Sequence, residues 1–121
     1  MTDLELRGAS WHFNADHDVA GLKLGRRLIA LYIDDAQRSE AVASPVRQNF
    51  RGYRSIFIGV GSHETMLSDA ERTAFNADEA GVAVTLPIYE AMPHGFTRFN
   101  VDIGTQAISD AAAWCVARLS E

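Results

Sequence analysis

The stretch "SIFIGVGSHETML", residues 55–67, runs from an apolar, β-branched segment into a polar loop. Its first part, 55–61, has the composition of a strand buried on both faces, which is typical of a parallel sheet. A second run, "VAVTLPIY" at 82–89, has the same character. Pro87 within it lacks an N–H and so requires an edge position or a bulge. These two runs predict strands, and they decide the fold class.

The segment between the two strands predicts a helix that begins at Ser68. Ser68 and Glu71 have the S-x-x-E spacing of a capping box, in which each side chain satisfies a free backbone N–H. Gly81 supplies the stop at the C-terminal end. A small-residue face on this helix is expected at Ala70, Ala74 and Ala77. Strand, helix and strand together predict a right-handed βαβ unit, and therefore an α/β fold.

Two further helices flank this unit in the sequence. The helical pattern over 22–33 carries a wide apolar arc, so we expect this helix to pack on more than one surface; the arc includes Leu24, Leu28 and Leu31. A last helix is predicted over 105–119, with Ile108, Ala112, Cys115 and Leu119 on one face. Cys115 has no partner for an internal disulfide and is expected to be a buried, inert thiol.

Size and charge limit the classes of protein and of partner. The chain has 121 residues, enough for one domain, and its 47% hydrophobic and 22% charged residues are those of a globular protein. The net charge of −5 and the absence of a basic tract argue against nucleic acid or an anionic membrane as partner. No apolar run approaches the roughly 20 residues that span a bilayer, and no signal peptide is apparent. These features predict a cytoplasmic protein.

Two strands alone cannot form a stable sheet that is covered on both faces. Both strand segments are too apolar to leave their edges bare in water, so the sequence resembles one side of a larger α/β sheet. Either further sequence completes that sheet, or a homo-oligomer covers the open edges.

Each predicted strand ends in a loop that carries a titratable group. Glu64 follows the first strand and His94 follows the second. The carboxyl ends of parallel strands lie at one edge of a sheet, so these side chains could meet. A carboxylate on one imidazole nitrogen leaves the other as a general base. The spacing equally allows Glu64 to be a carboxylate at a helix N-terminus, and His94 to be a turn residue satisfied by backbone groups.

Three motifs resemble α/β-hydrolases of the hormone-sensitive-lipase-like esterase group. They are "ASP" before the connector, "VGSHETMLSDA" after the first strand and "YEAMPHGF" after the second. Such proteins commonly show G-S-x-E-x-x-L-x-D and G-M-x-H-x-F at these places. Here Ala91 replaces the usual glycine, and Arg54 and Ser55 replace a common Pro-Pro pair.

The resemblance implies the organisation of the whole chain. Residues 1–121 would be a single, partial α/β-hydrolase domain that forms the C-terminal part of the fold. The segments "TDLEL" and "NADHD" are similar to the family's passage from its sixth strand into the cap. Residues 10–43 would then be a helical, cap-like segment, and 44–121 the last βαβα portion of a mostly parallel sheet.

The same resemblance assigns roles to the loop residues. Glu64 stands at the position of the family's triad acid and His94 at that of its base. Asp69 matches a commonly acidic position, which we interpret as a carboxylate in the first turn of a helix. The family's reaction is hydrolysis of carboxylic esters, so a small acyl ester is the expected substrate. No cofactor is expected.

The triad's nucleophile is missing from these residues. The family's serine lies in G-x-S-x-G, and neither this motif nor a His-Gly-Gly type oxyanion loop occurs in the sequence. We therefore expect the serine in further, N-terminal sequence and little activity from this chain alone. Two alternatives remain open: a non-catalytic interaction module derived from a hydrolase fragment, and a self-contained hydrolase that uses Ser62 or Ser10.

A crowded segment near the N-terminus raises the question of a metal site. It contains His12, Asp16, His17 and Asp18. These residues show no helical periodicity and have no matching second pair, so their spacing does not support a ligand set. We expect no bound metal.

Overall fold

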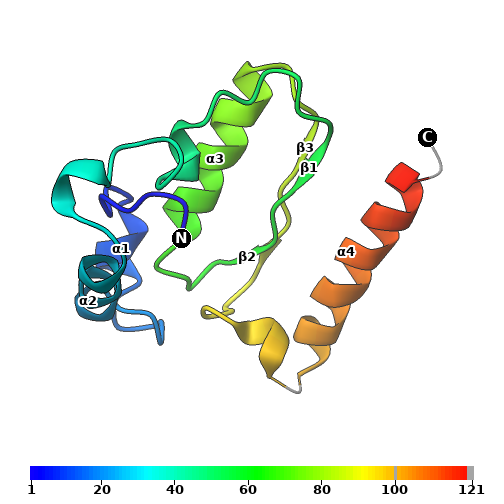
Figure 1. Ribbon diagram of the computed structural model, residues 1–121. Coiled ribbons are helices and arrows are strands. Elements are labelled where there is room, and N and C mark those ends of the chain that lie inside the picture. Colours follow the sequence, from blue (N-terminus) through cyan, green and yellow to red (C-terminus); the bar gives the residue numbers. More distant parts are fainter. Residues whose placement is uncertain (100, 120–121) are drawn as a thin grey trace.

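The computed structural model describes residues 1–99 and 101–119. Its helices are α1 (Ser10–Phe13), α2 (Leu22–Tyr32), α3 (Leu67–Glu79) and α4 (Asp102–Leu119). Its strands are β1 (Ile56–Phe57), β2 (Val60–Gly61), β3 (Val84–Thr85) and β4 (Ile88–Tyr89), and short 3₁₀ turns lie at Asp35–Gln37, Pro45–Arg47 and Phe96–Arg98. Figure 1 shows α1 and α2 at one end of the molecule, α3 and the strands in the middle, and α4 at the other end.

The strands pair in parallel, as the sequence predicts. Ile56 of β1 lies opposite Val84 of β3, and Val60 of β2 lies opposite Ile88 of β4. Each predicted strand is thus divided into two short ladders. Pro87 lies at the division, where it has no N–H to donate, although its carbonyl oxygen accepts a hydrogen bond from the Val60 amide at 3.2 Å. The α/β class with a parallel βαβ unit is confirmed.

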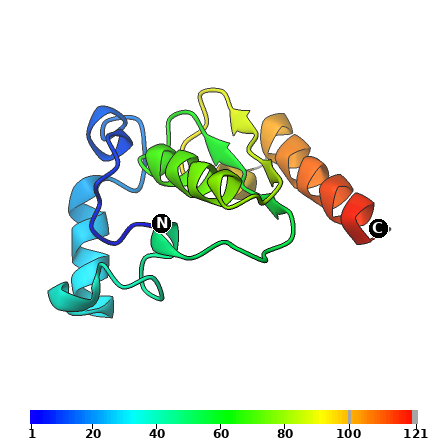
Figure 2. The same cartoon turned by 90° about the horizontal axis from the view of Figure 1, so that it is seen from above.

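Helices α3 and α4 lie on opposite sides of the strands (Figures 1 and 2). On the α3 side, Ile56 and Val84 pack against a buried cluster of Phe50, Ala77 and Val82. On the α4 side, the ring of Phe57 lies 5.8 Å from that of Trp114. The alternation of side chains along β1 explains this arrangement. The predicted small-residue face of α3 is buried at Ala70, Ala74 and Ala77.

The predicted capping box at the start of α3 is wrong. The helix begins one residue earlier, at Leu67, and its N-cap residue, Met66, makes no capping hydrogen bond through its side chain. Ser68 instead pairs with Ser10: the Ser10 amide donates to Ser68 Oγ at 3.0 Å, and the Ser68 amide donates to Ser10 Oγ at 2.9 Å. A tertiary partner has therefore replaced the local one, and it joins α1 to the first turn of α3.

The expected buried face of α4 is also wrong. Helix α4 buries Gly104 and Ala107, because these small residues let it approach Tyr89 and Phe96 closely. The predicted face points outward in this chain: Ile108, Cys115 and Leu119 are exposed. Hydrophobic periodicity identified an apolar stripe, but it could not tell which side of the helix this chain covers.

Only part of the apolar arc of helix α2 is buried. The helix buries Gly25 and Ile29, and Ile29 packs with Leu4 and Ala43. The other side of the arc is exposed, at Leu24, Leu28 and Leu31. Within residues 1–99 and 101–119, no helix combines the length and apolar character that crossing a membrane requires.

Asp69 lies in the first turn of α3, as expected, but it is almost completely buried. Its carboxylate accepts hydrogen bonds from the amides of Thr2 and Asp3, at 3.1 and 3.2 Å, and from Trp11 Nε1 at 3.4 Å. Burial raises the pKa of this carboxyl, although the three donors act in the opposite direction. Asp69 thus anchors the N-terminal segment to α3.

Candidate active site

Two loops meet at the carboxyl ends of the strands. We call residues 62–66 the acid loop and residues 90–95 the histidine loop. Gly61, just before the acid loop, allows their close approach: a Cβ at this position would lie 2.7 Å from the carbonyl carbon of Met92, and closer still to its oxygen. Any side chain at residue 61 would therefore push the loops apart.

Backbone groups fasten the two loops together. The Ser62 amide donates to the carbonyl oxygen of Tyr89 at 2.9 Å, and the His63 amide donates to that of Met92 at 3.1 Å. In return, the amide of Ala91 donates to Ser62 Oγ at 2.8 Å. Ala91 adopts a left-handed conformation with φ of 57°, which glycine adopts without the strain that a Cβ causes.

Glu64 and His94 form a hydrogen-bonded pair between the loops. Nδ1 of His94 lies 2.9 Å from Oε2 of Glu64, and Oε1 of Glu64 accepts the Gly61 amide at 2.8 Å. Both carboxylate oxygens are therefore occupied, and the Glu64 side chain is only 9% exposed. This arrangement fixes the carboxylate and places a proton on Nδ1 of the imidazole.

The environment favours the protonated imidazole. The hydrogen bond that His94 donates to Glu64 raises the pKa of His94, burial lowers it, and the negative charges of Glu64 and Asp18 raise it further. The His94 side chain is 45% exposed, so the imidazole ring is partly open to solvent. A histidine held in this way can accept a proton at Nε2 and bear the resulting charge.

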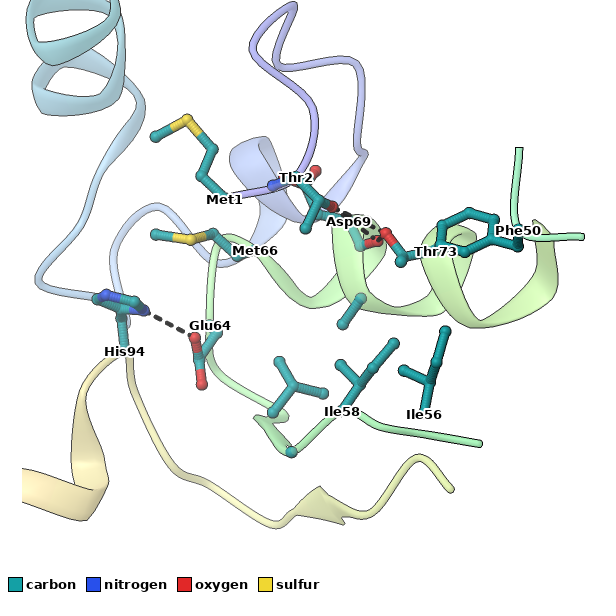
Figure 3. Close-up of a pocket in the computed structure, with 13 residues that line it drawn as sticks. Met1, Thr2, Phe50, Ile56, Ile58, Glu64, Met66, Asp69, Thr73 and His94 are labelled. Carbon is teal, nitrogen blue, oxygen red and sulfur yellow. Dashed lines mark hydrogen bonds and ion pairs between the residues drawn. The ribbon is translucent and has the colours of Figure 1, made fainter. Parts of the chain in front are cut away.

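An apolar hollow of about 290 Å³ begins beside this pair. Figure 3 shows the pair at one end of the hollow and Phe50 at the other, with Ile56 and Ile58 between them. Gly59 and Val60 also line it, and Asp69, Ala70 and Thr73 of α3 complete the lining, so the hollow lies between the strands and α3.

The hydroxyls of the two serines considered as alternative nucleophiles make hydrogen bonds to backbone groups. Ser10 is fully buried, and its hydroxyl donates to the carbonyl oxygen of Thr65 at 2.6 Å. Ser62 Oγ accepts the Ala91 amide. Within the described part of the chain, neither hydroxyl is hydrogen-bonded to His94.

The crowded N-terminal segment does not gather into a ligand set. Among residues 1–99 and 101–119, no three His, Cys, Asp or Glu side chains are grouped as a metal ion would require. The ring of His17 stacks on that of His63 at 4.9 Å, and Asp18 binds amide and hydroxyl donors of the two loops.

Asn14 and Asp18 are site residues whose role sequence reasoning missed. Asn14 Nδ2 donates to the carbonyl oxygens of Ser62 and Glu64, at 2.9 and 2.8 Å. The signal was present in "NADHD", residues 14–18, which we interpreted only as a family resemblance and as possible metal ligands. The local sequence of that segment does not indicate that its side chains contact both loops.

A parallel βαβ unit with a carboxylate–histidine pair beyond its strands defines an α/β protein equipped for acid–base chemistry. Residues 1–98 match the family described as alpha/beta hydrolase fold. The chain belongs to this family, and its neighbours among solved structures are esterases of the hormone-sensitive lipase group.

Individual relatives agree with this assignment. An esterase from Acinetobacter venetianus is 32% identical in an alignment of 117 residues, and the match covers 91% of this chain and 38% of that protein. A hormone-sensitive lipase homologue from a metagenome library is 33% identical, with a TM-score of 0.92 over 97% of this chain and 41% of its own. An esterase/lipase from an uncultured bacterium is 25% identical, with a TM-score of 0.92 over 99% of this chain and 41% of its own. The chain thus spans about two-fifths of the length of these relatives.

Proposed function

We propose that this chain supplies the acid and the base of a serine carboxylic-ester hydrolase, with Glu64 as the acid and His94 as the base. The observation that carries the proposal is the hydrogen bond of 2.9 Å between His94 Nδ1 and Glu64 Oε2, which leaves Nε2 available. Relatives that are themselves described as esterases support the reaction class.

The chemistry follows from the orientation of the imidazole. Nε2 of His94 takes the proton of a serine hydroxyl as that oxygen attacks the ester carbonyl, and Glu64 stabilises the imidazolium that forms. His94 then gives the proton to the leaving alcohol. In the second half of the reaction it activates water against the acyl-serine. The serine belongs to sequence outside these 121 residues, and the substrate is a small acyl ester.

We propose that the further sequence that carries the serine pairs with the open edge of β1 and β2. The amides of Ile56, Ile58 and Val60 donate toward β3 and β4, so the intervening amides of Phe57 and Gly59 point to the opposite edge. No strand within the described residues pairs with that edge. A parallel strand seated there would extend the sheet, and the loop that follows it would lie at the same edge of the sheet as His94.

A complementation assay tests the proposal. This chain is mixed with the separately expressed portion of the Acinetobacter venetianus esterase that it does not match, and hydrolysis of a short-chain nitrophenyl ester is followed. We expect activity that neither part has alone. The variant His94→Ala should abolish it, whereas His63→Ala, a histidine of the acid loop outside the pair, should retain it. Equal loss in both variants, or activity that survives His94→Ala, would reject the assignment.

A second candidate is a non-catalytic interaction module. The exposed apolar side chains of α2 and α4 favour it, because such surfaces promote association; they include Leu24, Leu28, Leu31, Ile108 and Leu119. On this hypothesis the chain forms a defined homo-oligomer that covers its open strand edges. Sedimentation that shows a compact, stable monomer at all concentrations would argue against it.

A further inference from the structure

Asp18 lies between α1 and α2, yet its carboxylate contacts both loops of the site. Oδ1 accepts the backbone amide of His94 at 2.8 Å. Oδ2 accepts the backbone amide of Thr65 at 2.6 Å, and the Thr65 hydroxyl lies 2.9 Å from the same oxygen. Thr65 directly follows Glu64. One carboxylate therefore holds the backbone at His94 and the backbone next to its acid partner.

These bonds differ from the other connections between the loops. The amides of Ser62 and His63 attach the loops near the ends of the strands, whereas Asp18 attaches them at the residues that carry the pair. Hydrogen bonds to an ionised acceptor are stronger than those between neutral groups, and one amide from each loop donates to this carboxylate. The separation between His94 and Glu64 thus depends on a side chain 76 residues away from His94.

The environment keeps Asp18 ionised. Burial opposes the charge, but hydrogen bonds from Thr65 and His94 outweigh it, so the pKa of the Asp18 carboxyl lies below its usual value. A second negative charge is therefore fixed close to the imidazole, in addition to that of Glu64. Asn14 binds the acid loop from the same segment, through the carbonyl oxygens of Ser62 and Glu64.

We infer that Asp18 is a positioning residue, which clamps the acid loop to the histidine loop and holds His94 against Glu64. The role of the pair in ester hydrolysis rests on the function proposed above, whereas the clamp itself does not. The cap-like segment, residues 10–43, carries Asp18. Through this residue the segment would set the geometry of the Glu64–His94 pair as well as cover the site.

The substitution Asp18→Asn tests the clamp. An asparagine keeps one carbonyl oxygen but places an NH₂ group where the second donor requires an acceptor, so one of the two amides loses its bond. The matched control is Asp16→Asn, which makes the same change of charge at an exposed residue of the same segment. The readout is the titration of the His94 ring nitrogens, followed by NMR in the full chain.

We expect Asp18→Asn to lower the pKa of His94 more than Asp16→Asn does. Hydrogen exchange at the amide of His94 or Thr65 should quicken by about tenfold or more, as loss of a charge-assisted hydrogen bond implies. Equal titrations and unchanged exchange in the two variants would overturn the inference. A His94 pKa that is not raised in the wild-type chain would instead refute the acid–base pair. The hydrogen-exchange rates alone would then show whether Asp18 clamps the two loops.

A measurement on the unmodified chain covers the case in which Asp18→Asn fails to fold. The amides of Thr65 and His94 both donate to Asp18. The inference therefore requires that both are protected from hydrogen exchange in the wild-type chain. Exchange of either amide at the rate of an unprotected loop would overturn it.

Discussion

Glu64 divides its two carboxylate oxygens between its own loop and the base. Oε1 accepts the Gly61 amide and Oε2 faces His94, so the carboxylate cannot turn without breaking one of these bonds. Because Glu64 is buried, water competes weakly for either oxygen. The result is a single orientation for the imidazole, with Nδ1 toward the acid and Nε2 away from it.

This pairing makes stability depend on pH in a defined direction. The pKa of His94 is raised in the folded chain above its ordinary value of 6.5. Its contribution to stability is therefore fully present below pH 6.5 and is lost as the pH rises through the folded-state pKa. We expect the free energies of unfolding of wild type and His94→Asn, measured in urea, to converge as the pH rises from below 6.5. A difference that is constant or grows would contradict the pairing.

Ala91 has a Cβ in a left-handed turn, which lowers the free energy of unfolding of the chain. Its φ of 57° strains any residue with a Cβ, and glycine relieves that strain at the cost of a more flexible unfolded chain. We expect Ala91→Gly to stabilise the chain by about 0.5–1 kcal/mol in urea unfolding. A destabilised variant would mean that the turn at Ala91 differs from that described.

At the scale of elements, the close approach of the two loops depends on Gly61. A methyl group there would meet the carbonyl group of Met92, which is backbone and cannot rotate away. Gly61→Ala should destabilise the chain by about 1–3 kcal/mol, as overpacking does. It should also lower the pKa of His94, because separating the loops lengthens its bond to Glu64. The control is Gly21→Ala, where a Cβ meets only the Ala15 oxygen, at 3.9 Å; a similar cost at both glycines would refute the account.

Helices and strands could be predicted from the sequence where the local residue pattern determines them. They could not be predicted where contacts with residues distant in the sequence determine them. The β-branched runs, Gly81 and the alanine face of α3 were sufficient for the parallel βαβ unit. Ser68 was misassigned because its partner is Ser10, and Cys115 because an apolar stripe does not reveal which side is covered. Glu64 and His94 could be located because parallel strands bring their following loops together. The contacts of Asp18 could not be predicted, since they depend on the path of a connecting segment.

At the level of the whole molecule, the described residues leave apolar surface and strand edges without cover. The edge of β1 and β2 that carries the amides of Phe57 and Gly59 has no partner strand within the described residues. Leucines of α2 and the outer face of α4 are exposed as well. These features, together with relatives more than twice as long, support a chain that acts as one part of a larger sheet.

Completion of that sheet should be visible without an assay of activity. When the unmatched portion of the Acinetobacter venetianus esterase is added, we expect a 1:1 complex in sedimentation and weaker binding of a dye that reports exposed apolar surface. The reason is that the added part would cover the open strand edge and exposed apolar surface. Two species that sediment independently, with dye binding unchanged, would contradict this view.

Glu64 orients the imidazole of His94 and favours its protonated form, and an NMR titration of the His94 ring nitrogens measures this effect. We compare the wild-type chain with Glu64→Gln and with Glu90→Gln, which makes the same change of charge at an exposed residue of the histidine loop. The account predicts a raised pKa for His94 in the wild type and in Glu90→Gln, and a clear fall in Glu64→Gln. A His94 pKa that is the same in all three chains would contradict it.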